Sequence, residues 1–360
     1  MGWRWELGDR PLGSAERDAL AHGLDGLGAD LSLLDVYETS VGCSGPWTRP
    51  LWLRALDGDR LAGATLVVLC RDSGRSFLGR SRLGTITRTV PPIWYWDRTG
   101  LGTDAVACPG LPAPGVDLDE LVGAAVARLS ARAPVGTVVD RCTATTAVAH
   151  LEVPFVGVCR PRLGAGTSTR ASARVLSEHR NLRRKVRRFA SRGGTVQRLH
   201  GPLPRSLRRP LLSGYGIERP VDPPFAELYP RLVQRQWNHR DDRLVHLVAR
   251  IDDRPVGYQT FWHTGRTLVM LSGVLDRPTE GTNAHAYENL LLASLDLADE
   301  LGCTGADLGP AINGAKTSLL GREPTSIRFV SRLAPLRAGL RHVIGRTRLA
   351  EGHLASVSDG

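Results

Sequence analysis

The sequence predicts a mixed α/β (α+β) protein with two domains, each built on a mixed central sheet that helices flank. Its 360 residues exceed the roughly 100–200 typical of one domain. Strand-like alternation and helical periodicity follow one another along both halves, and a segment rich in Gly, Ser and Thr at 162–173 separates them. We therefore expect domains at 1–165 and 166–332, followed by a basic helix and a disordered tail at 333–360.

The clearest signal in the first half is a hairpin across Asp57-Gly58, because this dipeptide favours a tight turn between strands. Apolar residues at helical spacing predict a helix over 117–131. The other expected elements are strands at 3–7, 31–36, 51–56, 61–70, 135–139 and 151–159, and a helix at 14–24 that Ser14 caps.

In the second half, the order of elements from 254 to 330 carries most of the information. Two strands precede a long amphipathic helix, a short strand, a turn with one lysine, and a final strand. The expected elements are helices at 177–192, 225–240 and 286–302, and strands at 194–199, 244–251, 255–263, 267–274, 305–307 and 323–330.

The positive charge of the chain is concentrated in one segment. The net charge is +11 with a pI near 10.0. Between Arg170 and Arg209 there are thirteen basic residues and one acid, so this segment carries +12 and the remainder is close to neutral. Such a segment can neutralise phosphates, and its alternative is a solvated helix face or a helix paired with acids. The candidate polyanion-binding residues are Arg183, Arg184, Lys185, Arg187, Arg188 and Arg192.

Several other classes of protein are disfavoured. The six cysteines show no CxxC spacing and the ten histidines form no HxxxH pair, so no metal site is expected. No apolar run reaches the roughly 18 residues of a membrane span, and the start lacks the pattern of a signal peptide. We therefore expect a cytoplasmic protein without a membrane partner.

From Ser177 onward the chain resembles the GNAT-type acyltransferases, in particular their Fem-like and BioF2-like branch. The resemblance covers roughly the last 190 residues. It rests on HRNLRRKVRR, on PVGYQTFWH followed by TLVMLSGV, on AYENLLLASLDLADELGC, and on ADLGPAINGAKTSLLG. It implies tandem GNAT-like domains, of which the first is the diverged partner.

Proteins of this branch take an aminoacyl group from a charged tRNA and place it on an amine, whereas other GNAT proteins use acyl-CoA. A CoA user typically presents Q/R-x-x-G-x-G/A before the long helix, where backbone N–H groups hold the pyrophosphate. The corresponding residues here, 277–283, read RPTEGTN, with one Gly, a Pro and Glu280. This departure disfavours CoA as the donor, and no resident cofactor is expected.

The resemblance also suggests the site residues. Lys316, one of only two lysines in the chain, corresponds to the lysine of the family and is expected to stabilise charge at the reacting carbonyl or a nearby phosphate. Asp307 is expected to orient the attacking amine or accept its proton, with a turn cap as the alternative. The candidate substrate contacts are Asn313, Tyr287, His285 and Trp262, the last with a core tryptophan as its alternative.

These features favour an aminoacyl-tRNA-dependent transferase that acts on the amine of a small molecule of specialised metabolism. An acyl-CoA-dependent N-acyltransferase is the second hypothesis. A non-catalytic RNA- or nucleotide-binding protein on a GNAT scaffold is the third.

Overall fold

The computed structural model describes part of the chain. For several strands it describes only the backbone. The described residues are 3–24, 48–70, 93–97, 124, 127–128, 131, 135–140, 150–158, 170–216, 233–263, 265, 267–275, 285–308, 323–330, 334–335 and 338. The chain divides into two compact units. Unit 1 comprises 1–157 and 323–360, and unit 2 comprises 158–322.

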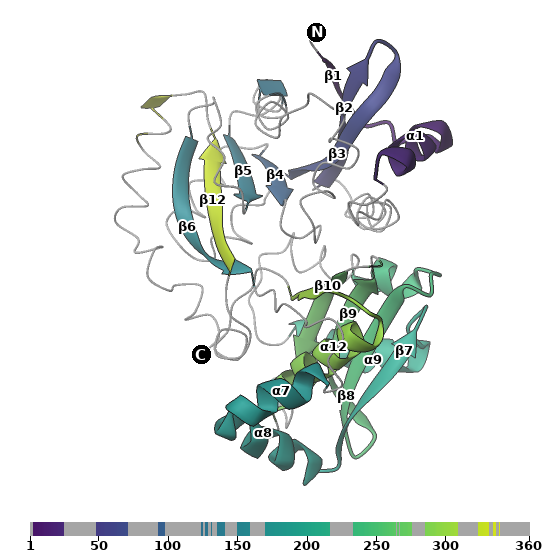
Figure 1. The fold of residues 1–360 in the computed structure, drawn as a ribbon, viewed down its shortest axis with the longest axis vertical. Helices are drawn as coiled ribbons and strands as arrows, with labels where there is room; N and C mark the ends of the chain where they lie inside the picture. The colour runs from purple at the N-terminus through teal and green to yellow at the C-terminus, as the bar shows by residue number, and fades with distance from the viewer. Residues whose placement is uncertain are drawn as a thin grey trace. The chain divides into compact units, whose positions relative to one another are not determined.

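Unit 1 contains a seven-stranded sheet in the order β1-β2-β3-β4-β5-β12-β6 (Figure 1). The pair β4–β5 is parallel and the pairs β1–β2, β2–β3, β3–β4 and β5–β12 are antiparallel, so the sheet is mixed. Its elements are β1 (Arg4–Gly8), α1 (Ser14–Leu24), β2 (Thr48–Asp57), β3 (Arg60–Cys70), β4 (Ile93–Asp97), β5 (Val135–Asp140), β6 (His150–Val158) and β12 (Glu323–Val330).

The hairpin predicted across Asp57-Gly58 is confirmed as β2 and β3. Gly58 has a φ of 61°, a left-handed conformation that glycine adopts without steric cost. Leu51, Trp52 and Leu53 of β2 are fully buried although successive side chains point to opposite faces, so this strand is covered on both faces. Their burial against neighbouring elements provides the apolar stabilisation of this sheet.

Unit 2 contains a five-stranded sheet in the order β11-β10-β9-β8-β7, which is antiparallel except for β10–β11. Its elements are α7 (Ala171–Glu178), α8 (Arg180–Ala190), β7 (Gly194–His200), α9 (Arg205–Gly216), β8 (Leu244–Ile251), β9 (Arg254–His263), β10 (Thr267–Leu275), α12 (Ala286–Glu300) and β11 (Gly305–Asp307). Residues 233–238 form a further helical stretch, inside the helix predicted at 225–240.

Helices cover both faces of the unit 2 sheet (Figure 1). On one face α12 buries Leu290, Leu291 and Leu295 against β8 and β9, with α7 and α8 beside it. On the other face α9 packs against Tyr258 and Trp237. The fold class predicted from the sequence, mixed sheets flanked by helices, is confirmed.

Three elements differ from their predictions. The final strand, expected in the second domain, is β12 in the sheet of unit 1, where it pairs with β5. The basic helix 177–192 is two helices, because the backbone of His179 is extended (φ −118°, ψ 91°) and breaks the chain of helical hydrogen bonds. Of the expected linker, residues 171–173 already belong to α7.

The helix α9 was missed because it contains Pro210. The signal that predicts it is the spacing of Leu203, Leu207 and Leu211, four residues apart and all buried. The strand predicted at 31–36, most of the helix at 117–131, and most of the helix and tail after residue 333 lie outside the described residues.

Candidate active site and polyanion surface

The parallel pair β10–β11 is short and then ends. Thr267, Leu268 and Val269 pair with Gly305, Ala306 and Asp307, after which β11 stops while β10 continues to Leu275. Beyond Val269, this edge of β10 has no strand partner among the described residues. Because ligands of α/β folds bind at the carboxyl ends of strands, the end of this parallel pair is our candidate active site.

A bulge between Met270 and Ser272 interrupts the pairing of β10 with β9 just beyond this point. The extra residue of a bulge leaves backbone groups outside the ladder, and bulges recur next to active sites. A free backbone N–H here can donate to a developing oxyanion.

Two buried polar side chains lie beside the bulge. The hydroxyl of Ser272 and both amide atoms of Gln259 have no hydrogen-bond partner among the described residues. They lie on opposite faces of the sheet, because Ser272 is opposite Thr260 while Gln259 is opposite Gly273. Buried polar groups are normally bonded, so both are candidates for ligand contact that the sequence analysis did not single out.

The predicted catalytic residues are only partly described. Asp307 is the last residue of β11, as predicted, and pairs with Val269 at the point where the strands part. Its side chain, and the whole of Asn313 and Lys316, lie outside the described residues. Their catalytic and substrate-binding roles therefore stay predictions.

The first turn of α12 carries a carboxylate of the chain itself. Glu288, in the first turn, is 9% exposed and accepts a hydrogen bond from Lys185 Nζ at 2.6 Å. An anion is stabilised at this end of a helix by the free backbone N–H groups. Since Glu288 supplies that anion and Lys185 neutralises it, this helix end is less available to a phosphate.

His285 and Tyr287 flank this pair. His285 precedes α12 in a left-handed conformation (φ 64°), and its Nδ1 lies 3.8 Å from Glu288 Oε1. Burial lowers the pKa of His285, as do the nearby positive charges of Lys185, Arg188 and Arg184, while Glu288 opposes them. Tyr287 is partly buried against the core of unit 2. Substrate contact by either residue stays a prediction.

Trp262, the other predicted substrate contact, has 0% of its surface exposed. Its ring lies under the guanidinium of Arg243, 4.9 Å from the ring centroid, and 5.6 Å from the ring of His239. The burial agrees with the alternative of a core tryptophan, and a role in substrate binding stays untested.

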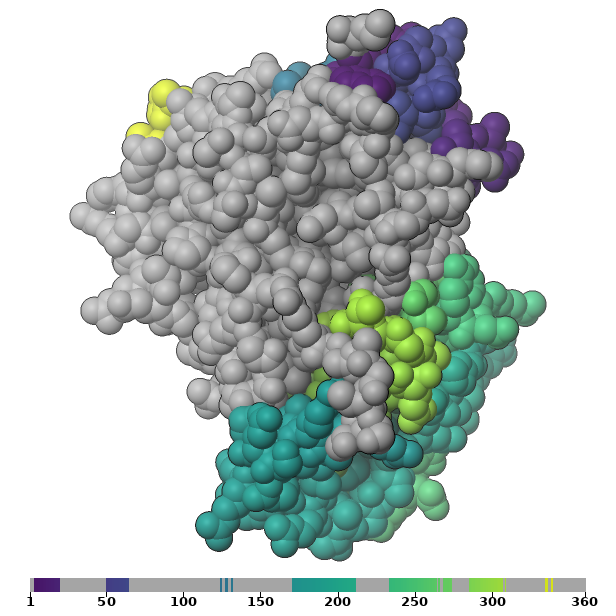
Figure 2. Space-filling model, viewed as in Figure 1, coloured from purple at the N-terminus to yellow at the C-terminus, as the bar shows by residue number. Residues whose placement is uncertain are grey.

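The helix α8 presents one face of exposed arginines. Leu182 and Phe189 are buried on the inner side. The exposed side carries Arg180, Arg184, Arg187 and Arg188, which we call the α8 arginine face. Their spacing of four, three and one places them on adjacent turns of one side of the helix. Figure 2 shows the teal surface to which α7 and α8 belong.

Two of the predicted polyanion-binding residues point elsewhere. Arg183 Nη1 donates to the carbonyl oxygens of Leu176 and Ser177 at 2.6 and 2.8 Å, which satisfies the C-terminal end of α7. Lys185 is engaged by Glu288. Arg192, after the end of α8, is half-buried. The paired inner face is thus present, while anion binding by the exposed face stays a prediction.

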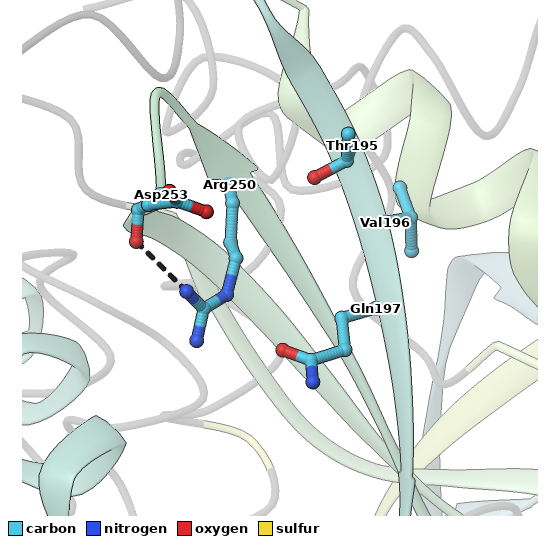
Figure 3. Close-up of a pocket in the computed structure, with 5 residues that line it drawn as sticks. All are labelled: Thr195, Val196, Gln197, Arg250 and Asp253. Carbon is cyan, nitrogen blue, oxygen red and sulfur yellow. Dashed lines mark hydrogen bonds between the residues drawn. The ribbon is translucent and has the colours of Figure 1, made fainter.

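Two hollows in the described part of unit 2 lie away from the end of the β10–β11 pair. One, of about 340 Å³, lies at the opposite edge of the sheet, where Thr195 and Gln197 of β7 point toward Arg250 (Figure 3). Arg250 Nη1 donates to the carbonyl oxygen of Asp253. Another, of about 430 Å³, is lined by Arg198 and Glu300, which pair with each other at 2.7 Å. Neither contains a candidate catalytic residue.

His246 of β8 is a fully buried histidine. Its Nε2–H donates to the carbonyl oxygen of Gly201, and its Nδ1 accepts from the Thr260 hydroxyl, both at 3.0 Å. Burial lowers its pKa to about 4, so it is neutral at pH 7. With both ring nitrogens satisfied, it stabilises the fold rather than transferring protons.

Within the described part of the chain, no three His, Cys, Asp or Glu residues are grouped so that they could hold a metal ion. Among the described helices, none has the length and apolar composition needed to cross a membrane.

No family model matches the chain, and no curated protein sequence is similar to it. Solved structures with a similar fold include three that cover most of this chain. The C-terminal domain (DUF2156) of a putative lysylphosphatidylglycerol synthetase from Agrobacterium fabrum is 11% identical with a TM-score of 0.50, over 91% of this chain and 97% of that chain. A tandem GNAT protein from the clavulanic acid biosynthesis pathway is 14% identical with a TM-score of 0.47, over 91% and 98%. FemX is 12% identical with a TM-score of 0.48, over 95% and 100%.

At 11% identity, the first of these likenesses shows a shared fold and nothing about activity. Together with the order of elements in unit 2, it supports a GNAT-type fold without assigning a branch. That unit 1 is a second GNAT-like domain stays a prediction.

Proposed function

We propose that this protein transfers an aminoacyl group from an aminoacyl-tRNA to the amine of a small-molecule acceptor, forming an amide bond. The observation that carries the proposal is the α8 arginine face. It presents four exposed guanidinium groups on a helix that lies beside α12 in a unit of GNAT-type fold. A nucleic-acid backbone is a polyanion long enough to use such a face, and Arg pairs well with phosphate oxygens.

The ion pair in the first turn of α12 supports the same donor. In an acyl-CoA-dependent enzyme of the GNAT type, the pyrophosphate would need this helix end. Here Glu288 and Lys185 already form an ion pair of 2.6 Å there. Displacing the buried carboxylate would leave a charge without its partner, which costs free energy.

The chemistry requires one substitution at an ester carbonyl. The acceptor amine attacks the carbonyl carbon, a C–N bond forms, and the ester C–O bond to the tRNA ribose breaks. The proton lost by the amine goes to a base, for which Asp307 is our candidate, and the base then gives this proton to the ribose oxygen as it leaves. Lys316 and a backbone N–H of the β10 bulge would stabilise the negative charge that develops on the carbonyl oxygen.

A labelling experiment tests the donor. The protein is incubated with bulk tRNA charged with labelled amino acids, or with labelled acyl-CoA, and with a panel of primary amines. We expect label transfer from tRNA to an amine, and we expect Lys316→Ala to reduce kcat by about 10²-fold or more without unfolding the chain. Transfer from acyl-CoA alone would overturn the proposed donor. Full activity of the Lys316 variant would overturn the assignment of the lysine.

A further inference from the structure

Gln259 in β9 is a buried amide without internal partners. The residue is 1% exposed, and neither its Oε1 nor its Nε2 has a hydrogen-bond partner among the described residues. A glutamine side chain can donate two hydrogen bonds and accept two. Leaving such a group unbonded in the interior costs free energy, so a glutamine kept here needs a reason.

Gln259 lies next to the part of β10 that extends beyond β11. Gln259 pairs with Gly273 of β10, and the neighbouring pair, Thr260 with Ser272, is the first after the bulge. Gly273 also lies on the part of β10 that has lost its β11 partner. The buried amide is therefore held within one residue pair of the backbone groups that the bulge leaves outside the ladder.

Gly273 makes room for this side chain. A Cβ at position 273 would lie 3.1 Å from Gln259 Cγ and 3.2 Å from the carbonyl oxygen of Tyr258, closer than ordinary contacts. A side chain there would push against Gln259. The glycine and the glutamine thus form a matched pair across β9 and β10, which is more than one isolated polar residue.

We infer that Gln259 is a substrate-binding residue whose amide holds both reacting groups. Its Nε2–H donates to the carbonyl oxygen of the acyl donor, and its Oε1 accepts from an N–H of the attacking primary amine. A carboxamide is suited to this because its donor and acceptor lie side by side in one plane, and the oxyanion and an N–H of the tetrahedral intermediate can lie next to each other. Gln259 gains and loses no atom in the reaction.

The inference rests on the proposed amide-forming reaction, but not on which donor is used. An aminoacyl ester and an acyl thioester both present a carbonyl oxygen, and both are attacked by an amine. Failure of transfer from tRNA therefore leaves the role of Gln259 testable with the donor that works.

The decisive variant is Gln259→Leu, which removes the polar atoms and keeps most of the volume. If the Gln259 amide is bonded only when substrate is present, the Gln259→Leu variant should be more stable than the natural protein without substrate. The reason is that an unbonded buried polar group is replaced by an apolar one. We expect the Tm to rise by about 2–4 °C. We expect kcat/KM to fall by about 10²-fold with the active donor, because hydrogen bonds to the reacting groups are lost. The control is Gln197→Leu on exposed β7, which should change neither quantity.

A structural role gives the opposite pattern. If a buried water satisfies the amide and no substrate touches it, Gln259→Leu lowers or preserves the Tm and leaves kcat/KM unchanged, and the inference fails. A second variant, Gly273→Ala, should lower kcat/KM by displacing the Gln259 side chain, and combining it with Gln259→Leu should add little further loss. Fully additive losses would also overturn the coupling between the two residues.

A binding measurement covers the case in which no donor is turned over. A stable 3′-aminoacylamino analogue of adenosine, in excess, should raise the Tm of the natural protein. It should raise the Tm of the Gln259→Leu variant by less. Equal, non-zero shifts in both proteins would overturn the inference without reference to activity, whereas no shift in either protein would count against the tRNA donor.

Discussion

Arg54 in β2 and Arg187 in α8 are the same residue type in opposite environments. Arg54 is 3% exposed, and its guanidinium donates to Glu16 at 2.9 Å and to the carbonyl oxygens of Arg10 and Pro11. Arg187 is exposed and bonds to no other described side chain. Its neighbours on the α8 arginine face are similarly exposed, although Arg184 also donates to Asn181.

The difference shows why a net charge of +11 does not by itself identify a binding surface. Arg183 and Arg208 are in the +12 segment, yet both donate to backbone carbonyl oxygens and support helix ends and loops. A buried arginine with several partners contributes to stability, and its loss should destabilise the protein. An exposed one contributes little to stability, so its loss should affect only a charged partner.

The largest effect is expected at the α8 arginine face. Replacing Arg180, Arg184, Arg187 and Arg188 with Gln should weaken tRNA binding by about 10³-fold at 0.1 M salt, because each phosphate contact contributes about 0.9 to the salt slope. Fluorescence anisotropy with labelled tRNA over a range of salt measures both quantities.

A matched control removes the same charge from exposed positions elsewhere in unit 2. It carries Gln in place of Arg205, Arg209, Arg235 and Arg240. If this control weakens binding equally, the charge acts without a defined surface and the α8 arginine face is not the binding site.

The second effect concerns stability. Replacing Arg54 with Met leaves the half-buried carboxylate of Glu16 with fewer partners and should lower the free energy of unfolding by about 3 kcal/mol. Urea unfolding measures the change. Arg60→Met, at an exposed position of the same hairpin, should stay within about 0.5 kcal/mol of the natural protein. An equal loss in both variants would contradict the comparison of environments.

The pH dependence of Glu16 checks the same contact. Burial acts to raise its pKa, but hydrogen bonds from Arg54, the Gly13 N–H and Arg10 outweigh it and lower the pKa to about 2. Because the folded-state pKa is below the ordinary value of 4.5, the stabilisation is present above pH 4.5 and is lost as the pH falls toward 2. This loss should be smaller in the Arg54→Met variant.

The smallest effect is expected for Lys185, which lies in the basic helix but is engaged by Glu288. Lys185→Met should cost roughly 1–2 kcal/mol of stability, and a double-mutant cycle with Glu288→Gln should recover part of it. The salt slope for tRNA binding should not change. A slope lowered by about one would mean that Lys185 contacts a phosphate, as the sequence suggested.

The local elements were predictable because their signals are local. Asp57-Gly58 predicted the first hairpin, the period of residues 286–300 predicted α12, and the acid at 307 was correctly expected to end a strand. The break at His179 was not predicted, because the residues on both sides of it are compatible with a helix.

The sequence by itself determined the mixed α/β class, the localised basic segment and the order of elements in unit 2. It did so because propensity, periodicity and charge act over a few residues. Only the tertiary structure decided that β12 joins the sheet of unit 1, that Lys185 meets Glu288, and that Gln259 is buried opposite Gly273. These are pairings between residues far apart in the chain, and the local sequence around one residue does not indicate which distant residue it contacts.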